Sequence, residues 1–275
     1  MTSPVLRTSG LARTFRTKTG TVEAVRGIDL SVDGGEILGF LGPNGAGKTT
    51  TLRMLTTLLA PTSGTATVAG HDLARDAAGV RTKIGYVAQS GGVDPAVSVR
   101  EELTTQARLY GLSRPQAAER TAELAADLGL DDVLDRRCGT LSGGQRRRLD
   151  IAMALTHRPG ILFLDEPTTG LDPGSRANLW ELIRRLRDHP PGLRPGGAPG
   201  TTVFLTTHYL DEAEALADRL VIVDRGEIAA EGTAEELKSR YGGGPGASLQ
   251  ETFIRITGRG SVTGGDDAGA PVTVL

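Results

Sequence analysis

A short apolar run followed at once by a glycine-rich loop is the feature that most constrains how this chain folds. Residues 36–41 (EILGFL) predict a buried strand, and residues 42–49 (GPNGAGKT) match the pattern G-x-x-x-x-G-K-[ST]. Leucines at helical spacing over 52–59 predict a helix directly afterwards. This order aims several backbone N–H groups and the positive end of a helix at one anion, so the loop is predicted to bind phosphate.

Each residue type in this loop has its own task. The glycines let the backbone approach the phosphates, Lys48 reaches the β- and γ-phosphates, and the Thr49 hydroxyl coordinates Mg²⁺. The chain has 38 Gly but only four Lys, and the strand and helix on either side make a chance match rarer still. We therefore expect an ATP site that contains Gly42, Pro43, Asn44, Gly45, Ala46, Gly47, Lys48, Thr49 and Thr50.

A second apolar run, residues 161–164 (ILFL), ends in two acidic residues, Asp165 and Glu166. Because the run is uniformly apolar, it predicts a strand in a sheet that is covered on both faces. In a phosphate-loop ATPase, the carboxylate at the end of such a strand holds Mg²⁺ through water. We expect Asp165 to have this role and Glu166 to polarise the attacking water as general base.

Two further polar side chains follow predicted strands: Gln89 comes after 83–88, and His208 comes after 201–207. Ligands of open α/β sheets bind outside the carboxyl ends of the strands. Four strands therefore carry the glycine-rich loop, Gln89, the acidic pair and His208 to one edge of the sheet. We expect these groups to form a single site.

Strands alternate with helices along most of the chain, which predicts an α/β fold with a mostly parallel sheet between helices. From about 90 to 158 Ala and Leu recur every three or four residues, which predicts an inserted helical subdomain. The predicted ATPase domain spans 5–240, and the C-terminal extension, 241–275, is expected to be partly disordered. No function suggests itself for the Pro- and Gly-rich loop at 190–200.

Composition restricts the classes of protein to consider. The formal net charge of −2 argues against a nucleic-acid binder, and the arginines at 146–148 are interpreted as a solvated helix face. The single cysteine, Cys138, cannot form an internal disulfide, which fits a reducing cytosol. No apolar stretch approaches 18 residues, and the N-terminus lacks the apolar core of a signal peptide. We expect a soluble chain that works at a membrane only through a partner.

A second glycine-rich segment, residues 141–145 (LSGGQ), precedes a predicted helix. Ser142 can cap this helix, and the glycines expose N–H groups to an anion. One nucleotide does not need two such helix ends from one polypeptide. The second end is therefore expected to serve a nucleotide held by another copy, through Leu141, Ser142, Gly143, Gly144 and Gln145.

These motifs together, in this order, resemble the ATP-binding cassette family, the ATPase subunits of ABC transporters. The loop at 42–49 resembles Walker A, residues 161–166 resemble Walker B, and LSGGQ resembles the family signature, which other phosphate-loop ATPases lack. The resemblance implies a P-loop NTPase with a RecA-like, mostly parallel sheet, an inserted helical subdomain and an antiparallel β part near the N-terminus. It also implies that two copies, by default a homodimer, close head to tail around two ATP.

The resemblance further implies roles for single residues. Phe15 would stack on adenine, and Gln89 would link the nucleotide to the helical subdomain, which contacts membrane subunits in this family. Asp172 would couple the two sites of the dimer, and His208 would contact the γ-phosphate beside the catalytic Glu166. The implied ligands of Mg²⁺ are Thr49, Gln89 and Asp165.

Beyond the short motifs, the longer segments at 141–173, 206–219 and 248–259 are similar in sequence to ATPase subunits of daunorubicin-resistance exporters. Those exporters act with a separate multi-span permease. The expected function is hydrolysis of ATP on the cytoplasmic face of the membrane to drive export of drugs or antibiotics. Alternatives are an importer ATPase, which shares every motif, and a soluble ABC ATPase that acts on ribosomes or DNA. A protein that binds ATP only to regulate is a third, against which the intact Asp165, Glu166 and His208 argue.

Overall fold

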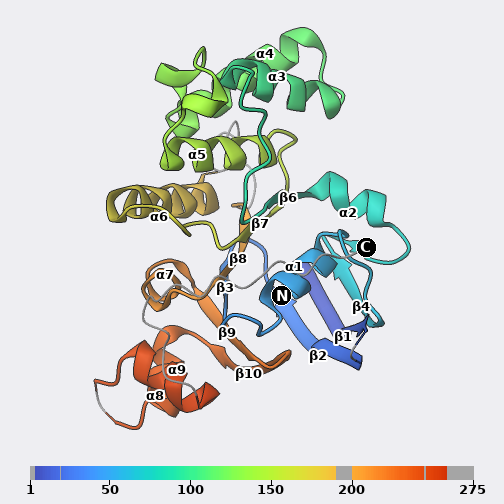
Figure 1. The fold of residues 1–275 in the computed structure, drawn as a ribbon, viewed down its shortest axis with the longest axis vertical. Helices are drawn as coiled ribbons and strands as arrows, with labels where there is room; N and C mark the ends of the chain where they lie inside the picture. The colour runs from blue at the N-terminus through green and yellow to red at the C-terminus, as the bar shows by residue number, and fades with distance from the viewer. Residues whose placement is uncertain (1–3, 19, 190–199, 245, 259–275) are drawn as a thin grey trace.

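The computed structural model describes residues 4–18, 20–189, 200–244 and 246–258 (Figure 1). Most of the Pro- and Gly-rich loop and the last 17 residues, for which disorder is predicted, lie outside the described residues. Among the described residues, no helix combines the length and the apolar character needed to cross a bilayer.

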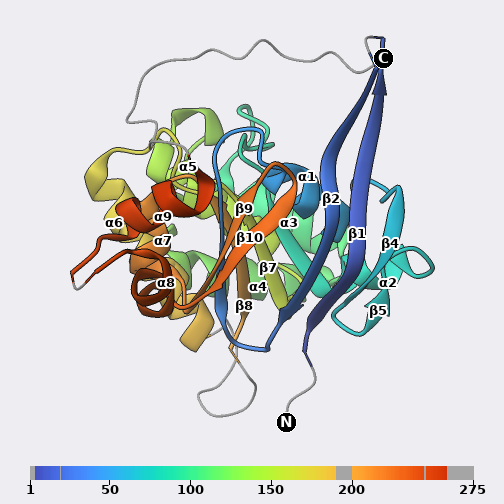
Figure 2. The same cartoon turned by 90° about the horizontal axis from the view of Figure 1, so that it is seen from below.

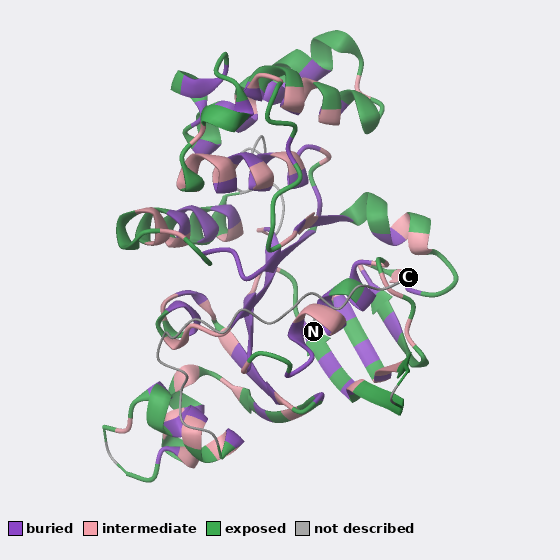
Figure 3. Cartoon of the chain, in the orientation of Figure 1, coloured by how far each residue is buried: buried purple, intermediate pink, exposed green. Residues whose placement is uncertain are grey.

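A six-stranded sheet with the strand order β10-β9-β3-β8-β7-β6 forms the centre of the molecule. Its strands are β3 (Ile37–Leu41), β6 (Ile84–Val87), β7 (Ile161–Asp165), β8 (Thr202–Thr207), β9 (Arg219–Asp224) and β10 (Glu227–Gly232). All neighbours pair in parallel except β10, which forms the predicted hairpin with β9. Every residue of β3, β7 and β8 is buried, as expected of strands that are covered on both faces (Figure 3). The predicted α/β fold with a mostly parallel sheet is confirmed.

The predicted antiparallel part is a second sheet with the order β2-β1-β4-β5. It consists of β1 (Leu6–Thr17), β2 (Gly20–Val32), β4 (Ser63–Val68) and β5 (His71–Asp72). The helix α1 (Lys48–Leu55) lies between the two sheets, and its Leu52 and Leu55 join one core with Leu6 and Leu30 of this sheet and Phe40 of the central sheet (Figure 2). The predicted extension of this helix to Leu59 is wrong, because Thr57 takes a left-handed φ of 64° that an α-helix cannot continue.

Three helices between β6 and β7 form the helical region at the top of Figure 1. They are α3 (Val99–Leu109), α4 (Arg114–Leu128) and α5 (Gly143–Ala154), with short 3₁₀ turns at Asp131–Val133 and Cys138–Thr140. A serine caps the start of each of these helices in a capping box with a Glu or Gln three residues on. A core made by α3, α4 and α5 continues to Val87 and Leu164 of the central sheet, so the helical region is packed on the sheet.

The remaining helices cover the other parts of the central sheet. They are α2 (Ala77–Lys83), α6 (Pro173–Asp188), α7 (Leu210–Leu216), α8 (Ala234–Tyr241) and α9 (Leu249–Thr257). The helix α9 lies within the predicted C-terminal extension, and its Leu249 and Phe253 are buried with Leu237 of α8 and Ala230 of β10. The first part of that extension is therefore packed on the body of the protein.

Candidate functional site

The glycine-rich loop joins β3 to α1 at the carboxyl edge of the central sheet. A Cβ atom on Gly42 would lie 2.4 Å from the carbonyl oxygen of Val223, and one on Gly47 would lie 2.5 Å from that of Ala24, so only glycine fits at either position. Gly47 also has a φ of 102° and caps α1. No described side chain caps this helix end, so its amide groups point from the loop toward any anion placed there.

The side chain of Lys48 is only 4% exposed and curls back over the loop that precedes it. Its Nζ donates to the carbonyl oxygens of Gly42 (2.8 Å) and Pro43 (3.2 Å) and lies 3.4 Å from Oε1 of Glu166. Burial lowers the pKa of Lys48, and the Glu166 and Asp165 carboxylates oppose that shift. The ammonium group thus rests on groups that an incoming phosphate could replace.

The two expected metal ligands of α1 and β7 are in contact. Oδ1 of Asp165, a residue 1% exposed, accepts hydrogen bonds from the hydroxyls of Thr206 (2.7 Å) and Thr49 (3.1 Å). The described residues contain no cluster of three or more His, Cys, Asp or Glu side chains able to hold a metal. A hydroxyl and one carboxylate fit Mg²⁺, which keeps several waters and is bound by one or two carboxylates together with substrate phosphates.

Four side chains converge on the carboxylate of Glu166, which follows β7 directly. Its Oε1 lies 3.4 Å from Nζ of Lys48 and 3.2 Å from Nδ1 of His208. Its Oε2 accepts hydrogen bonds from Nε2 of Gln89 (3.0 Å) and Oγ1 of Thr169 (3.4 Å). Burial alone would raise the pKa of Glu166, but His208 and Lys48 together hold it below its ordinary value. The group is therefore ionised at neutral pH and able to accept a proton.

The backbone of Glu166 is strained and held on both sides. Its φ of 45° costs a non-glycine residue about 1–3 kcal/mol, which the surroundings must offset. Its N–H donates to the carbonyl and hydroxyl oxygens of Thr206, both at 3.1 Å, and its carbonyl accepts from Nη2 of Arg147 at 3.3 Å. These hydrogen bonds hold the backbone in the conformation from which the carboxylate of Glu166 reaches Lys48 beside the glycine-rich loop.

The LSGGQ segment forms the start of α5, at the exposed end of the helical region. Oγ of Ser142 accepts from the N–H of Gln145 (3.2 Å), and Oε1 of Gln145 accepts from the N–H of Ser142 (3.0 Å). A Cβ atom on Gly144 would lie 3.0 Å from Oγ of Ser175, in the first turn of α6. Asp172 caps that same helix through the N–H (2.9 Å) and Oγ (2.6 Å) of Ser175. The LSGGQ segment therefore lies beside Asp172 of its own chain.

Comparison with known proteins identifies the family of this chain. The model of the family described as "ABC transporter" matches residues 25–169. The daunorubicin/doxorubicin resistance ATP-binding protein DrrA of Streptomyces peucetius is 50% identical over 237 residues, which are 86% of this chain and 68% of that protein. The doxorubicin resistance ATP-binding protein DrrA of Mycobacterium tuberculosis is 44% identical over 240 residues, which are 87% of this chain and 67% of that protein. This chain belongs to the ABC transporter family.

Solved structures agree with the family assignment. The ATP-binding subunit of an ABC transporter has a TM-score of 0.76 at 26% identity, over 92% of this chain and 99% of that structure. A dimeric ATP-binding cassette in a post-hydrolysis state, bound to ADP and Pi, has a TM-score of 0.73 at 24% identity, over 83% of this chain and 98% of that one, and shows the shared fold. The predicted family, the predicted fold and the ABC-type ATPase class are confirmed.

Within this ABC cassette, the structure brings together most of the residues that the sequence singled out. Lys48, Gln89 and His208 meet at the carboxylate of Glu166, and the predicted metal ligands lie beside them. Phe15 lies in the antiparallel sheet, half-buried, with the guanidinium of Arg13 4.7 Å above its ring. Stacking of this ring on adenine stays a prediction.

The interpretation of residues 146–148 as a solvated face is wrong for Arg147. This arginine is 6% exposed, and its guanidinium donates to four backbone carbonyls at the carboxyl ends of two strands. The acceptors are Ala88 (2.6 Å), Pro167 (2.7 Å), Asp165 (3.1 Å) and Glu166 (3.3 Å). Helical spacing carries a signal for this, since Arg147, Ile151 and Ala154 share one buried face of α5.

A second residue not singled out from the sequence is Glu212 of α7, which is fully buried. Its Oε1 accepts a hydrogen bond from Nε1 of Trp180 on α6 at 3.2 Å. Burial raises the pKa of Glu212, against hydrogen bonds that lower it. The contact joins the helix that starts beside Asp172 to the helix that follows His208.

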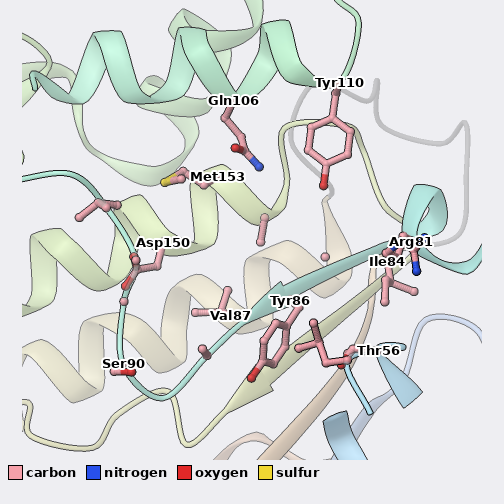
Figure 4. A pocket seen from close by; sticks show the side chains of 17 residues that line it. Thr56, Arg81, Ile84, Tyr86, Val87, Ser90, Gln106, Tyr110, Asp150 and Met153 are labelled. Carbon is pink, nitrogen blue, oxygen red and sulfur yellow. The ribbon is translucent and has the colours of Figure 1, made fainter. Parts of the chain in front are cut away.

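A groove of about 380 Å³ opens between β6 and the helical region, next to the segment that carries Gln89 (Figure 4). Tyr86 of β6 lines one side, and Gln106, Tyr110 and Met153 of α3, the turn after it and α5 line the other. Tyr110 is exposed and stacks on His157 with ring centroids 4.0 Å apart. An exposed aromatic ring at the rim of a groove is typical of a contact surface.

Proposed function

We propose that this chain is the ATP-binding and ATP-hydrolysing subunit of an ABC exporter of drugs or antibiotics. The observation that carries the proposal is the convergence of Lys48, Gln89 and His208 on the ionised carboxylate of Glu166. The names of the relatives support the substrate class, since two of them describe resistance to daunorubicin or doxorubicin and another describes resistance to linearmycin.

The contacts of Lys48 suggest how ATP would prepare the site. Bound phosphates would attract the ammonium group away from Oε1 of Glu166, which it now approaches to 3.4 Å. Oε1 would then be available to polarise the attacking water, while His208 keeps its place beside the carboxylate and contacts the γ-phosphate. Thr49, Gln89 and Asp165 would hold Mg²⁺, which neutralises phosphate charge when it is bound.

A second copy would complete each site. The start of α5 is exposed and presents Ser142 and Gly143 to solvent, so it can meet a nucleotide held by another chain. In a head-to-tail pair, Walker A of one copy and the signature of the other would enclose each ATP, and Asp172 beside the signature would contact the facing site. Phe15 would stack on the adenine ring from the antiparallel sheet.

The groove of Figure 4 is our proposed contact for a separate multi-span permease on the cytoplasmic face of the membrane. It lies between the sheet that holds ATP and the helical region, and the segment from Ala88 to Gly92 that carries Gln89 forms part of its wall. A permease segment seated there would sense whether Gln89 is bound at the nucleotide.

Two measurements test this function. Purified wild-type chain should hydrolyse ATP with Mg²⁺, whereas Glu166→Gln should bind ATP equally well and lose on the order of 10²–10⁴-fold in turnover, since it lacks the general base. Wild-type turnover in Glu166→Gln would contradict the role of Glu166. Co-expression with a neighbouring multi-span membrane protein should then yield a complex whose ATPase rate rises with daunorubicin-like compounds. Stable binding to ribosomes or DNA without any membrane partner would favour the soluble alternative.

A further inference from the structure

The buried arginine of α5 connects the signature helix to both strand ends that carry catalytic groups. We propose that Arg147 is a positioning residue for hydrolysis, whose guanidinium sets the place of Glu166 and Gln89 relative to the helical region. The inference rests on the proposed function, because it assumes that Glu166 activates the attacking water.

The contacts of the guanidinium fall on two separate segments. Nη1 donates to the carbonyl of Ala88, the residue before Gln89, at 2.6 Å. Nε and Nη2 donate to the carbonyls of Pro167 (2.7 Å), Asp165 (3.1 Å) and Glu166 (3.3 Å), which follow β7. One side chain of the helical region therefore holds the backbone at the ends of β6 and β7 together.

The neighbouring arginines of α5 have a different pattern of partners. Arg146 donates to the carbonyl of Cys138 (3.1 Å), and Arg148 donates to those of Leu128 (3.3 Å) and Gly129 (3.0 Å). These acceptors all belong to the helical region itself. Of the three consecutive arginines, Arg147 is thus the one whose described hydrogen bonds reach the central sheet.

Charge strengthens the same link. Asp150, one turn further along α5, has Oδ2 3.9 Å from Nη1 of Arg147, and both side chains are at least nine-tenths buried. A Cβ atom on Gly91 would lie 2.8 Å from each carboxylate oxygen of Asp150, so this pair is packed against the segment that carries Gln89. Burial lowers the pKa of Arg147, and the charges of Asp150, Asp165 and Glu212 oppose that shift.

The consequence concerns the strained peptide of Glu166. Thr206 of the central sheet accepts its N–H, while Arg147 of the helical region donates to its carbonyl. A rotation of the helical region against the sheet would therefore move the carbonyl of Glu166 and the backbone before Gln89 in one step. Because the side chains of Gln89 and Glu166 hydrogen-bond each other at 3.0 Å, Arg147 would preserve that contact.

Arginine has a property that lysine lacks at this position. A guanidinium is a rigid planar fork with five N–H donors, so it can bind carbonyls of two segments in a fixed geometry. A lysine ammonium keeps the charge that Asp150 requires but is a single point on a flexible stem. Arg147→Lys should therefore fold and keep the charge but lose the geometric link. Arg147→Met should lose the charge as well as the link.

The test compares ATP hydrolysis and ATP binding in full-length variants. Arg147→Lys should lower kcat by about 10-fold and Arg147→Met by up to about 10²-fold, the scale on which a displaced catalytic group slows a reaction. The dissociation constant for ATP should change less than about 2-fold in Arg147→Lys, since the loop that holds the phosphates does not contact this residue. Arg148→Met is the matched control, and its kcat should stay within about 2-fold of wild type.

Turnover, ATP affinity and melting temperature together decide the inference. A fall in kcat with unchanged ATP affinity and unchanged melting temperature in Arg147→Lys supports it. Wild-type kcat in Arg147→Lys and Arg147→Met overturns it, as does a parallel loss of ATP affinity, melting temperature and kcat, which indicates a role in stability alone. If Glu166→Gln is inactive while both Arg147 variants keep wild-type turnover, only this inference fails. A wild-type chain that hydrolyses no ATP removes the proposed function and this inference with it.

Discussion

Two helices of this chain, α1 and α5, begin in glycine-rich sequence, and the surroundings of their N-terminal ends differ. The start of α1 is capped by Gly47 alone among the described residues and lies against the buried Lys48, Asp165 and Glu166. The start of α5 is closed by its own capping box, through Ser142 and Gln145, and its first residues are exposed. The first end lies against buried charged groups and leaves its amides open, whereas the second lies beside Asp172 and Ser175 of α6 and is exposed at Ser142 and Gly143.

The difference bears on what each helix end could offer to a phosphate. A phosphate at the start of α1 would find the ammonium group of Lys48, the carboxylate of Glu166 and the hydroxyl of Thr49. A phosphate at the start of α5 would meet the exposed amide of Gly143, and one helix end is a weak anion site by itself. Figure 1 shows α5 in the helical region and α1 beside the antiparallel sheet, on different parts of the molecule. A site that uses both ends is therefore expected to need two chains.

Ser142→Arg is the change with the largest expected effect on this comparison. A long cation at the start of α5 would block a nucleotide held by the facing copy, so turnover should fall by about 100-fold or more, as it does when a transition-state donor is lost. ATP affinity of the isolated monomer should not change, because the phosphate loop is untouched. Equal losses of monomer binding and of turnover would mean that the signature acts on the nucleotide of its own chain.

Lys48→Ala tests the other helix end. Loss of a charged hydrogen-bond donor to phosphate removes about 1.5–3 kcal/mol, which corresponds to roughly 10–100-fold weaker ATP binding by one chain. The matched control is Lys83→Ala, an exposed lysine at the end of α2, which should bind ATP like wild type. Unchanged ATP affinity in Lys48→Ala, measured by nucleotide titration, would contradict its role at the phosphates.

A mixture of the two inactive variants distinguishes shared sites from separate ones. A dimer of one Lys48→Ala chain and one Ser142→Arg chain has one site with both defects and one with neither, if each site combines Walker A and signature from different copies. Random pairing of equal amounts should then restore about a quarter of wild-type sites. If the ATPase activity of the mixture does not exceed that of the separate variants, the two-chain interpretation is contradicted.

Much of this arrangement could be predicted because strand ends in a parallel sheet share an edge. The sequence segments before Gln89, Asp165 and His208 predicted three strands. The structure brings all three residues to the edge that carries the phosphate loop. The capping role of Ser142 could be predicted from its position before a helix and is present. These features depend on local pattern and on the rules of parallel sheets.

Other features depend on contacts between distant segments, which local pattern does not determine. Three consecutive arginines predicted a solvated face, but packing of α5 on the sheet buries only the middle one, where four carbonyls satisfy it. The acidic text of α7 likewise gave no sign that Glu212 would be fully buried against Trp180. Nor does spacing indicate that Lys48 rests on Glu166.

The prediction with the smallest expected effect distinguishes the capping role of Ser142 from its proposed contact with the nucleotide of the facing copy. Ser142→Ala removes the side-chain oxygen that accepts the N–H of Gln145, and loss of such a cap costs about 1 kcal/mol of folding free energy. Because the backbone amides of Gly143 and Gly144 remain, turnover should fall far less than in Ser142→Arg. Denaturant unfolding measures the first effect and an ATPase assay the second. If Ser142→Ala loses as much turnover as Ser142→Arg at unchanged stability, the hydroxyl itself contacts the facing nucleotide, and the two helix ends are more alike than their structures suggest.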